Sequence, residues 1–351
     1  MTRWLVVAVL IAPLVNAPGS ASARAVPTAV LLLALALVGT RCRSLWQRAF
    51  VALAVLSFVL SGMQTWGEVG LFGLLGFFLL HQEATRRSSA EWVTVRRAIA
   101  AAAAFQVAWM GMQALGFDPI FSPRSYQGHF VPGPPPAIGW FGNPSDTALF
   151  LGLSLPALVA VSPWLLVPGV VALAALHSTA GLVGAAITTA WLAWRSGPRL
   201  RAALLVGLVA GSAYFLARLD SQGLGPRPTG WAIAARLAWA RPVLGWGPNA
   251  VDSPHLRVTD TRTNERWNYF FSEWLQGTVE LGFGAPLLAA GYLVSLARRL
   301  RGRWAACGEA LPGALALLAV SFFSIPLRIV PTALLAALWL GRLESIAQEA
   351  A

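Results

Sequence analysis

The fold class is decided by residues 146–194, which read DTALFLGLSLPALVAVSPWLLVPGVVALAALHSTAGLVGAAITTAWLAW. After Asp146 this stretch contains no Asp, Glu, Lys or Arg, and short turn-forming segments divide it into three apolar runs. Apolar runs of this length joined by turns of a few residues predict helices that cross a lipid bilayer in succession. We therefore expect a membrane protein built from helices.

The whole chain has the same character. Its 351 residues are 57% hydrophobic and only 11% charged, whereas a soluble domain carries roughly 25% charged residues. We expect one all-α membrane domain over residues 1–351, a polytopic bundle of about 12 helices (about 10 to 12). The expected spans are residues 4–16, 26–39, 49–62, 68–81, 97–116, 146–161, 164–177, 180–194, 202–217, 274–297, 310–325 and 329–341.

The first two dozen residues allow two interpretations. Arg3, the apolar run from Trp4 to Val15 and the small residues 20–23 resemble a secretory signal that is cleaved. The same residues also suit a first membrane helix followed by a loop of small residues. We favour the membrane helix, because further apolar runs follow at once.

The arginines indicate which side of the membrane each loop faces. Positive charge near the ends of spans stays in the cytoplasm. If the N-terminus is cytoplasmic, most of the 26 arginines fall on the cytoplasmic side. These are Arg3, Arg41, Arg43, Arg48, Arg86, Arg87, Arg96, Arg97, Arg195, Arg199, Arg201, Arg298, Arg299, Arg301, Arg303 and Arg342. We expect a multi-pass protein of the bacterial inner (cytoplasmic) membrane with both termini cytoplasmic. The larger loops, 117–145 and 218–272, then face the periplasm.

Several function classes are not expected. The net charge of +12 comes entirely from arginine, and these arginines lie beside apolar runs rather than in a stripe with interleaved aromatic residues, so nucleic acid is not an expected partner. Cys42 and Cys307 have neither metal-ligand nor disulfide spacing. Without a metal-ligand cluster, a phosphate-binding glycine loop or a nucleophile elbow, we expect no metal and no cofactor.

The first outer loop, 117–145, contains Arg124 and, near its end, Asn143 and Pro144. Asn-Pro is a turn signal, and Ser145 or Asp146 is positioned to cap the next helix. A turn and a cap explain these residues without a further role. The alternative is that Arg124, Asn143 and Asp146 contribute to a substrate site at the outer mouth.

The long outer loop, 218–272, is rich in arginine. Residues 229–240 predict a short helix along the membrane surface, and residues 242–249 read as a turn that contains glycine. Arg227, Arg236 and Arg241 suit bidentate contact with phosphate oxygens. Attraction to anionic lipid head groups explains the same arginines. The loop also holds the single histidine His255.

Polar residues begin the helix after this loop. Glu273, Gln276 and Glu280 are three and four residues apart and therefore share one helix face. Acidic residues in a membrane segment usually face a polar cavity or the interior of the bundle. His177 lies at another outer helix junction, where a hydrogen-bonded interfacial histidine is the ordinary explanation.

Residues 116–341 resemble the O-antigen ligase and O-antigen polymerase superfamily. Four pieces carry the resemblance. The first is Gly139-Trp140-Phe141-Gly142-Asn143-Pro144-Ser145, and the second is Arg227 and Trp231 followed by Pro242, Gly245 and Gly247. The third is the segment 272–282 with Gln276 and Glu280, and the fourth is the long loop between late helices. Two departures are visible. The family's histidine falls on Phe271, and an arginine at the start of a membrane helix falls on Thr179.

The resemblance implies a metal-independent glycosyltransferase that takes glycan from a polyprenyl diphosphate carrier at the outer face of the inner membrane. It implies Arg227 at the diphosphate, assisted by Arg241 or Arg236, with Glu273 or His255 as the base. Gln276, Glu280, His177, Arg124, Asn143 and Asp146 are further candidates for binding substrate. The acceptor is a glycan, a lipid A core or a protein, and membrane lipids surround the chain.

Because Phe271 cannot accept a proton, a second class of function remains open. The chain is then a transporter or a membrane protein of glycan assembly without catalytic activity. The ordered motifs and the outward loop favour the transferase.

Overall fold

The computed structural model describes residues 42, 44–61, 65–118, 137–207, 209, 227–252, 256 and 269–349. Every regular element with defined bounds in these ranges is a helix, which confirms the all-α class. The α-helices are α3 (Leu45–Leu60), α4 (Thr65–Thr85), α5 (Ser89–Ala114), α6 (Pro144–Val161), α7 (Leu166–Ala175), α8 (Thr179–Arg195), α10 (Arg227–Ala240), α11 (Glu273–Leu281), α12 (Gly284–Arg299), α13 (Ala310–Val320) and α14 (Val330–Gln348). Short 3-10 turns, η1 (Pro163–Leu165) and η2 (Ala250–Asp252), join them. The expected spans 4–16 and 26–39 lie outside the described residues.

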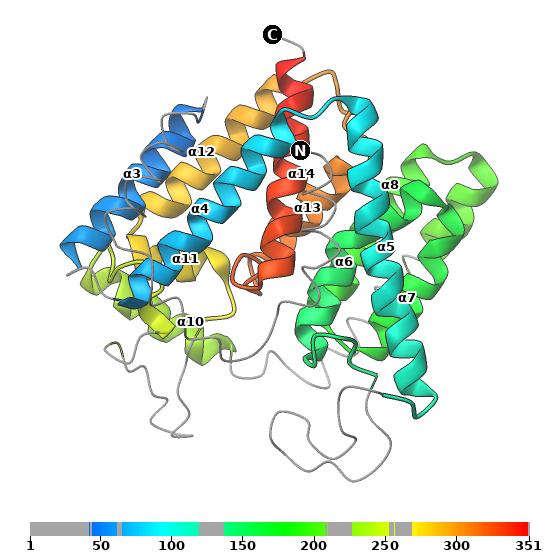
Figure 1. Cartoon of the computed structure of the whole chain (residues 1–351), viewed down its shortest axis with the longest axis horizontal. Coiled ribbons are helices and arrows are strands. Elements are labelled where there is room, and N and C mark those ends of the chain that lie inside the picture. Colours follow the sequence, from blue (N-terminus) through cyan, green and yellow to red (C-terminus); the bar gives the residue numbers. More distant parts are fainter. Residues whose placement is uncertain are drawn as a thin grey trace.

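Helix α14 is the centre of the bundle (Figure 1). It packs against α4, α6, α12 and α13, and most of its residues are buried. The Trp339 indole Nε1 donates to the Leu153 carbonyl oxygen of α6 at 3.0 Å. Gly341 lets α4 approach closely, because a Cβ there would lie 2.6 Å from the His81 carbonyl oxygen. A helix buried on nearly all sides needs such apolar and small residues around its whole circumference.

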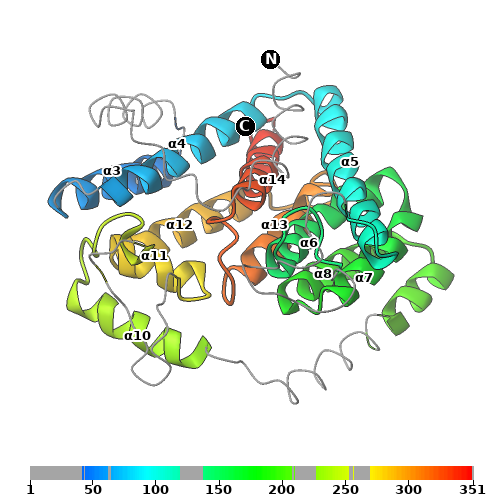
Figure 2. The same ribbon diagram turned by 60° about the horizontal axis from the view of Figure 1, so that its bottom comes forward.

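Two groups of helices flank α14 (Figures 1 and 2). One group contains α5, α6, α7, α8 and α13, and in it α6 and α8 touch backbone to backbone at Gly152 and Gly184. The other contains α3, α4, α11 and α12, which share a smaller apolar core. Helix α10 lies across the lower end of the second group in Figure 1 and packs on α11.

Charged residues gather at the two opposite ends of the bundle. At the end where α14 finishes, Arg299 pairs with Glu344 and Arg96 with Glu309. At the end where α10 lies, Arg328 pairs with Glu273 and Glu280. We call these the α14 C-terminal end and the α10 end (Figure 1).

The expected single span 274–297 is wrong, because the structure divides it into α11 and α12. Gly282 ends α11 with φ at +79°, a backbone conformation that favours glycine. Pro286, in the first turn of α12, has no backbone N–H with which to continue α11. The chain therefore turns between the two helices.

The loop boundaries also differ in detail. Helix α6 begins at Pro144, so the loop expected at 117–145 ends at Asn143. Asn143 itself caps α6, since its side-chain oxygen accepts from the Ser145 N–H at 2.9 Å. The expectation that Ser145 or Asp146 is the cap was wrong. Within the expected loop 218–272, α10 corresponds to the short helix expected at 229–240.

Two described helices, α6 and α14, are long and apolar enough to cross a membrane. Shorter apolar helices cover residues 45–60, 69–85, 163–175 and 310–320. Their composition is compatible with a bundle embedded in lipid, although both long helices are mostly buried inside the protein.

Candidate functional site

The candidate site lies at the α10 end, where α11 meets the connection between α13 and α14. The Ser272 side chain caps α11 by accepting from the Leu275 N–H at 3.4 Å. The Glu273 N–H donates to the carbonyl oxygens of Ser321, at 2.8 Å, and Ser324, at 3.0 Å. These bonds anchor the start of α11 to the end of α13.

Arg328 joins the acidic face of α11 to this connection. Its Nε lies 3.3 Å from Glu273 Oε1, and its Nη2 lies 2.7 Å from Glu280 Oε2. Its Nη1 donates to Asn249 Oδ1 at 3.5 Å. The Gln276 Nε2 donates to Glu280 Oε1 at 2.8 Å. We call Asn249, Glu273, Gln276, Glu280 and Arg328 the Arg328 cluster.

The shared helix face predicted for Glu273, Gln276 and Glu280 is confirmed, and it faces inward. The Glu280 side chain is 3% exposed and that of Glu273 13%. Gln276 connects α11 to the preceding segment, because its Oε1 accepts from the Phe270 N–H at 3.1 Å. Two carboxylates around one guanidinium leave the Arg328 cluster with a formal charge of −1.

Burial and charge act in opposite directions on this cluster. Burial raises the pKa of the Glu273 carboxyl, and the neighbouring Arg328 lowers it by less. Burial also lowers the pKa of Arg328, but the two carboxylates raise it by more, so the guanidinium stays protonated. Glu273 is therefore a carboxylate with a raised affinity for protons, as a general base requires.

The glycine turn after α10 fits onto the C-terminal end of α11. The Trp246 and Gly247 N–H groups donate to the carbonyl oxygens of Val279 and Glu280, both at 2.9 Å. Gly245 has φ at +65°, and a Cβ there would lie 2.4 Å from the Glu280 carbonyl carbon. The spacing of glycine in this segment thus permits a close backbone contact that orients the helix carrying Glu280.

The three candidate arginines of the long loop occupy different surroundings. Arg227, the first residue of α10, lies over the Phe271 ring at 5.2 Å, and burial lowers its pKa. Arg236 is exposed on α10. Arg241 is exposed and stacks on the Trp246 ring at 4.1 Å, which stabilises the glycine turn. Of the three, Arg227 is the one whose guanidinium contacts the segment directly before α11.

Phe271 stands where the family resemblance places histidine. It has φ at +51°, a conformation that is unusual for a bulky residue, and its ring packs edge-to-face on Tyr269 at 5.0 Å. A strained residue at this position shows that the segment before α11 is held in a defined shape.

The remaining candidates lie at the starts of α6 and α8. Burial raises the pKa of Tyr269, and the Asp146 carboxylate raises it further, so α6 begins near the segment before α11. His177 is an exposed residue with φ at +54° in the turn before α8. Thr179 begins α8. Arg124 and His255 lie outside the described residues.

Sequence reasoning missed Arg328 and Asn249 as members of the cluster. A signal for Arg328 was present, because two glutamates on one face of a buried helix require a cation. Asn249 gives no such signal, since its contact depends on how the glycine turn packs. In the described ranges, no group of three or more His, Cys, Asp or Glu side chains is placed to hold a metal ion.

Comparisons with known proteins assign no family to the chain. No protein-family model matches it, and a search of curated proteins finds no match.

Proposed function

We propose that this chain is a membrane glycosyltransferase of the O-antigen ligase or polymerase type, acting in surface-polysaccharide assembly. It would take glycan from an undecaprenyl-type diphosphate carrier and transfer it to a glycan, a lipid A core or a protein. The observation that carries this proposal is a convergence in space. Arg227 contacts Phe271, directly before α11, and the glycine turn at 242–247 contacts the C-terminal end of α11, so both flank the helix that carries Glu273 and Glu280.

We also propose that the bundle is polytopic in the bacterial inner membrane, with about 12 spans, both termini cytoplasmic and the α10 end in the periplasm. This is supported by the arginines at the opposite end. Arg299 pairs there with Glu344 of α14, Arg342 of α14 donates to Ser89 of α5, and Arg96 of α5 pairs with Glu309. Such clustering of positive charge is typical of the cytoplasmic side.

In the proposed reaction, an acceptor hydroxyl attacks the anomeric carbon of the donor sugar. The new bond between oxygen and the anomeric carbon forms while the bond between that carbon and the phosphate oxygen breaks. The bonding electron pair leaves with the lipid diphosphate, whose added negative charge Arg227 would stabilise. The acceptor proton passes to the Glu273 carboxylate, whose raised pKa suits it to this role.

Within this proposal Arg328 is a positioning residue. It pairs with both Glu273 and Glu280, and it prevents their mutual repulsion from opening the site. Because the Arg328 cluster has a formal charge of −1, it suits a neutral hydroxyl of the acceptor better than a diphosphate. The diphosphate would lie toward Arg227.

One observation favours the second candidate, a transporter or a glycan-assembly protein without catalytic activity. The Phe271 ring rests on the Arg227 guanidinium, where the family resemblance would place an imidazole. An apolar ring in that place supplies no proton acceptor.

The test is a transfer assay with purified full-length protein, a lipid diphosphate-linked glycan and acceptor. Arg227→Ala should lower the rate by about 100-fold or more, as expected for loss of one group that stabilises transition-state charge. Arg303→Ala, the matched control at an exposed arginine of the α14 C-terminal end, should retain the wild-type rate. Undiminished transfer by Arg227→Ala would overturn the proposed mechanism. Substrate flux in proteoliposomes without any transfer would establish the transporter instead.

A further inference from the structure

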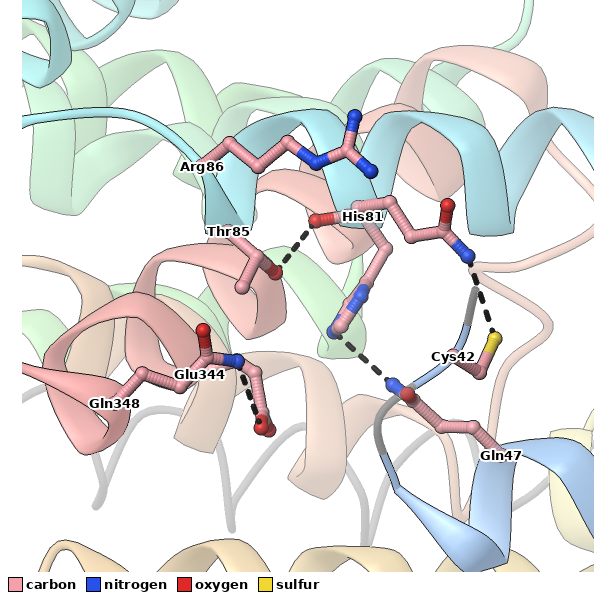
Figure 3. Close-up of a pocket in the computed structure, with 8 residues that line it drawn as sticks. Cys42, Gln47, His81, Thr85, Arg86, Glu344 and Gln348 are labelled. Carbon is pink, nitrogen blue, oxygen red and sulfur yellow. Dashed lines mark hydrogen bonds between the residues drawn. The ribbon is translucent and has the colours of Figure 1, made fainter. Parts of the chain in front are cut away.

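A polar pocket lies at the α14 C-terminal end of the bundle, away from the Arg328 cluster. It is lined by residues from the start of α3, the end of α4 and the end of α14: Cys42, Gln47, His81, Gln82, Thr85, Arg86, Glu344 and Gln348 (Figure 3). The proposed transfer reaction uses none of these residues.

The floor of this pocket carries no net charge. Arg299 forms a bidentate ion pair with the Glu344 carboxylate: its Nη1 donates to Oε1 at 2.6 Å and its Nη2 donates to Oε2 at 2.8 Å. His81 Nε2 lies 2.9 Å from the Tyr292 hydroxyl and 3.4 Å from Gln47 Nε2. Because the His81 side chain is only 2% exposed, burial favours its uncharged form. The buried charges are therefore paired within the protein.

The rim of the pocket is basic. Arg86 is exposed at the end of α4, and its side chain extends across the top of the pocket (Figure 3). In the described part of the chain its guanidinium forms no ion pair, although Arg87 next to it pairs with Glu83 and Glu91. With a neutral floor, Arg86 gives the pocket an excess positive charge. We therefore expect an anionic ligand, such as a phosphate, whose oxygens accept hydrogen bonds from two N–H groups of the planar guanidinium.

Exposed apolar residues adjoin the pocket. Leu45 and Trp46 begin α3 directly before Gln47, and their side chains are 74% and 41% exposed. Tryptophan and leucine beside arginine are typical of the level of the lipid head groups. Basic pockets between helices on the cytoplasmic side bind the head groups of anionic lipids. A lipid whose chains lie along α3 could place its phosphate at Arg86.

We infer that this pocket binds the phosphate of an anionic phospholipid, with Arg86 as its principal ligand. The inference goes beyond the proposed function, because it assigns a second site and requires no transfer chemistry. The amide groups of Gln47 and Gln82 lie on the pocket wall, within the same recess as Arg86, and provide further polar contacts for the head group.

The test measures binding of a short-chain phosphatidylglycerol to delipidated full-length protein in a neutral detergent, by native mass spectrometry. Short-chain phosphatidylcholine and inorganic phosphate are the comparison ligands. Arg86→Gln should weaken phosphatidylglycerol binding about tenfold or more, because a hydrogen bond to a charged group is lost. Arg86→Lys keeps the charge and should lose less. Arg301→Gln is the matched control, since Arg301 is also exposed at this end, and should leave the affinity unchanged.

The outcomes separate the pocket from general attraction to charge. Equal weakening by Arg86→Gln and Arg301→Gln would overturn the inference, since it would show diffuse attraction. Equal binding of phosphatidylcholine and phosphatidylglycerol by wild-type protein would also overturn it. If inorganic phosphate binds as tightly as phosphatidylglycerol, the site takes free phosphate and the lipid assignment is wrong. A selective loss with Arg86→Gln supports it.

Discussion

Replacing Arg328 with methionine should destabilise the protein strongly, because it removes the guanidinium that pairs with both Glu273 and Glu280. Methionine keeps a long apolar side chain, so the packing of the connection between α13 and α14 changes little. The two carboxylates then remain on the inner face of α11 without their partner. Repulsion between them and the loss of their hydrogen bonds oppose the native arrangement.

The size of the effect follows from burial. Removing one partner of a buried ion pair costs roughly 3–5 kcal/mol. The Arg328 side chain is 25% exposed, while those of Glu273 and Glu280 are 13% and 3% exposed. Solvent around Arg328 places the expected loss at the lower end, about 3 kcal/mol. Adding Glu280→Gln to Arg328→Met should restore roughly 1–2 kcal/mol, because it removes the more deeply buried unpaired charge.

The assay is denaturant unfolding of the full-length protein in detergent micelles, followed by tryptophan fluorescence. The control is Arg236→Met on the exposed face of α10, which should change the free energy of unfolding by no more than about 0.5 kcal/mol. Arg328 lowers the pKa of Glu273, so its loss should raise that pKa further. The deficit of Arg328→Met should therefore shrink as the pH falls, because protonation of the carboxyls removes the unpaired charge. A loss no larger than that of Arg236→Met would refute the reasoning, and so would the absence of rescue by Glu280→Gln.

Three further predictions concern the same end of the bundle. In the wild type, the transfer rate should rise with pH as the Glu273 carboxyl, whose pKa is raised, loses its proton and becomes able to act as the base. Glu273→Gln should abolish this rise. A pH profile identical to wild type would exclude Glu273 as the base. Gly245→Ala should lower the free energy of unfolding by at least about 1–2 kcal/mol, because alanine is disfavoured at φ +65° and its Cβ would collide with the backbone of Glu280. The control is Gly73→Ala, where a Cβ meets no atom within 4 Å. Asn143→Ala should cost about 1 kcal/mol through loss of the α6 cap, and an unchanged unfolding curve would contradict this.

Much of the helical framework could be predicted from hydrophobicity alone. The run at 146–161 lies within α6, and the segment at 229–240 lies within α10. These predictions succeed because an apolar helix is determined by its own residues. The common face of Glu273, Gln276 and Glu280 is likewise a consequence of helical geometry within one short segment.

Features that depend on contacts between distant segments could not be predicted in this way. The break at Gly282 lies within a run that is long and apolar enough to read as one span. Arg328 joins α11 from 48 residues further along the chain. Its pairing with Glu280 depends on how α13 and α14 return to α11. The network of His81, Tyr292 and Glu344 combines single polar residues from α4, α12 and α14, and none of these residues carries a motif.

The central position of α14 has a consequence for biosynthesis. Helices α4, α6, α12 and α13 all pack against it, yet it is the last described helix to leave the ribosome. Until it is synthesised, the earlier helices lack the surface that joins the two groups, and the nascent chain must persist as a partly assembled set of helices. Quality-control proteases in the cell would encounter that open intermediate. Substitutions in α14 should therefore reduce the amount of protein that accumulates, even where they lie far from either polar site.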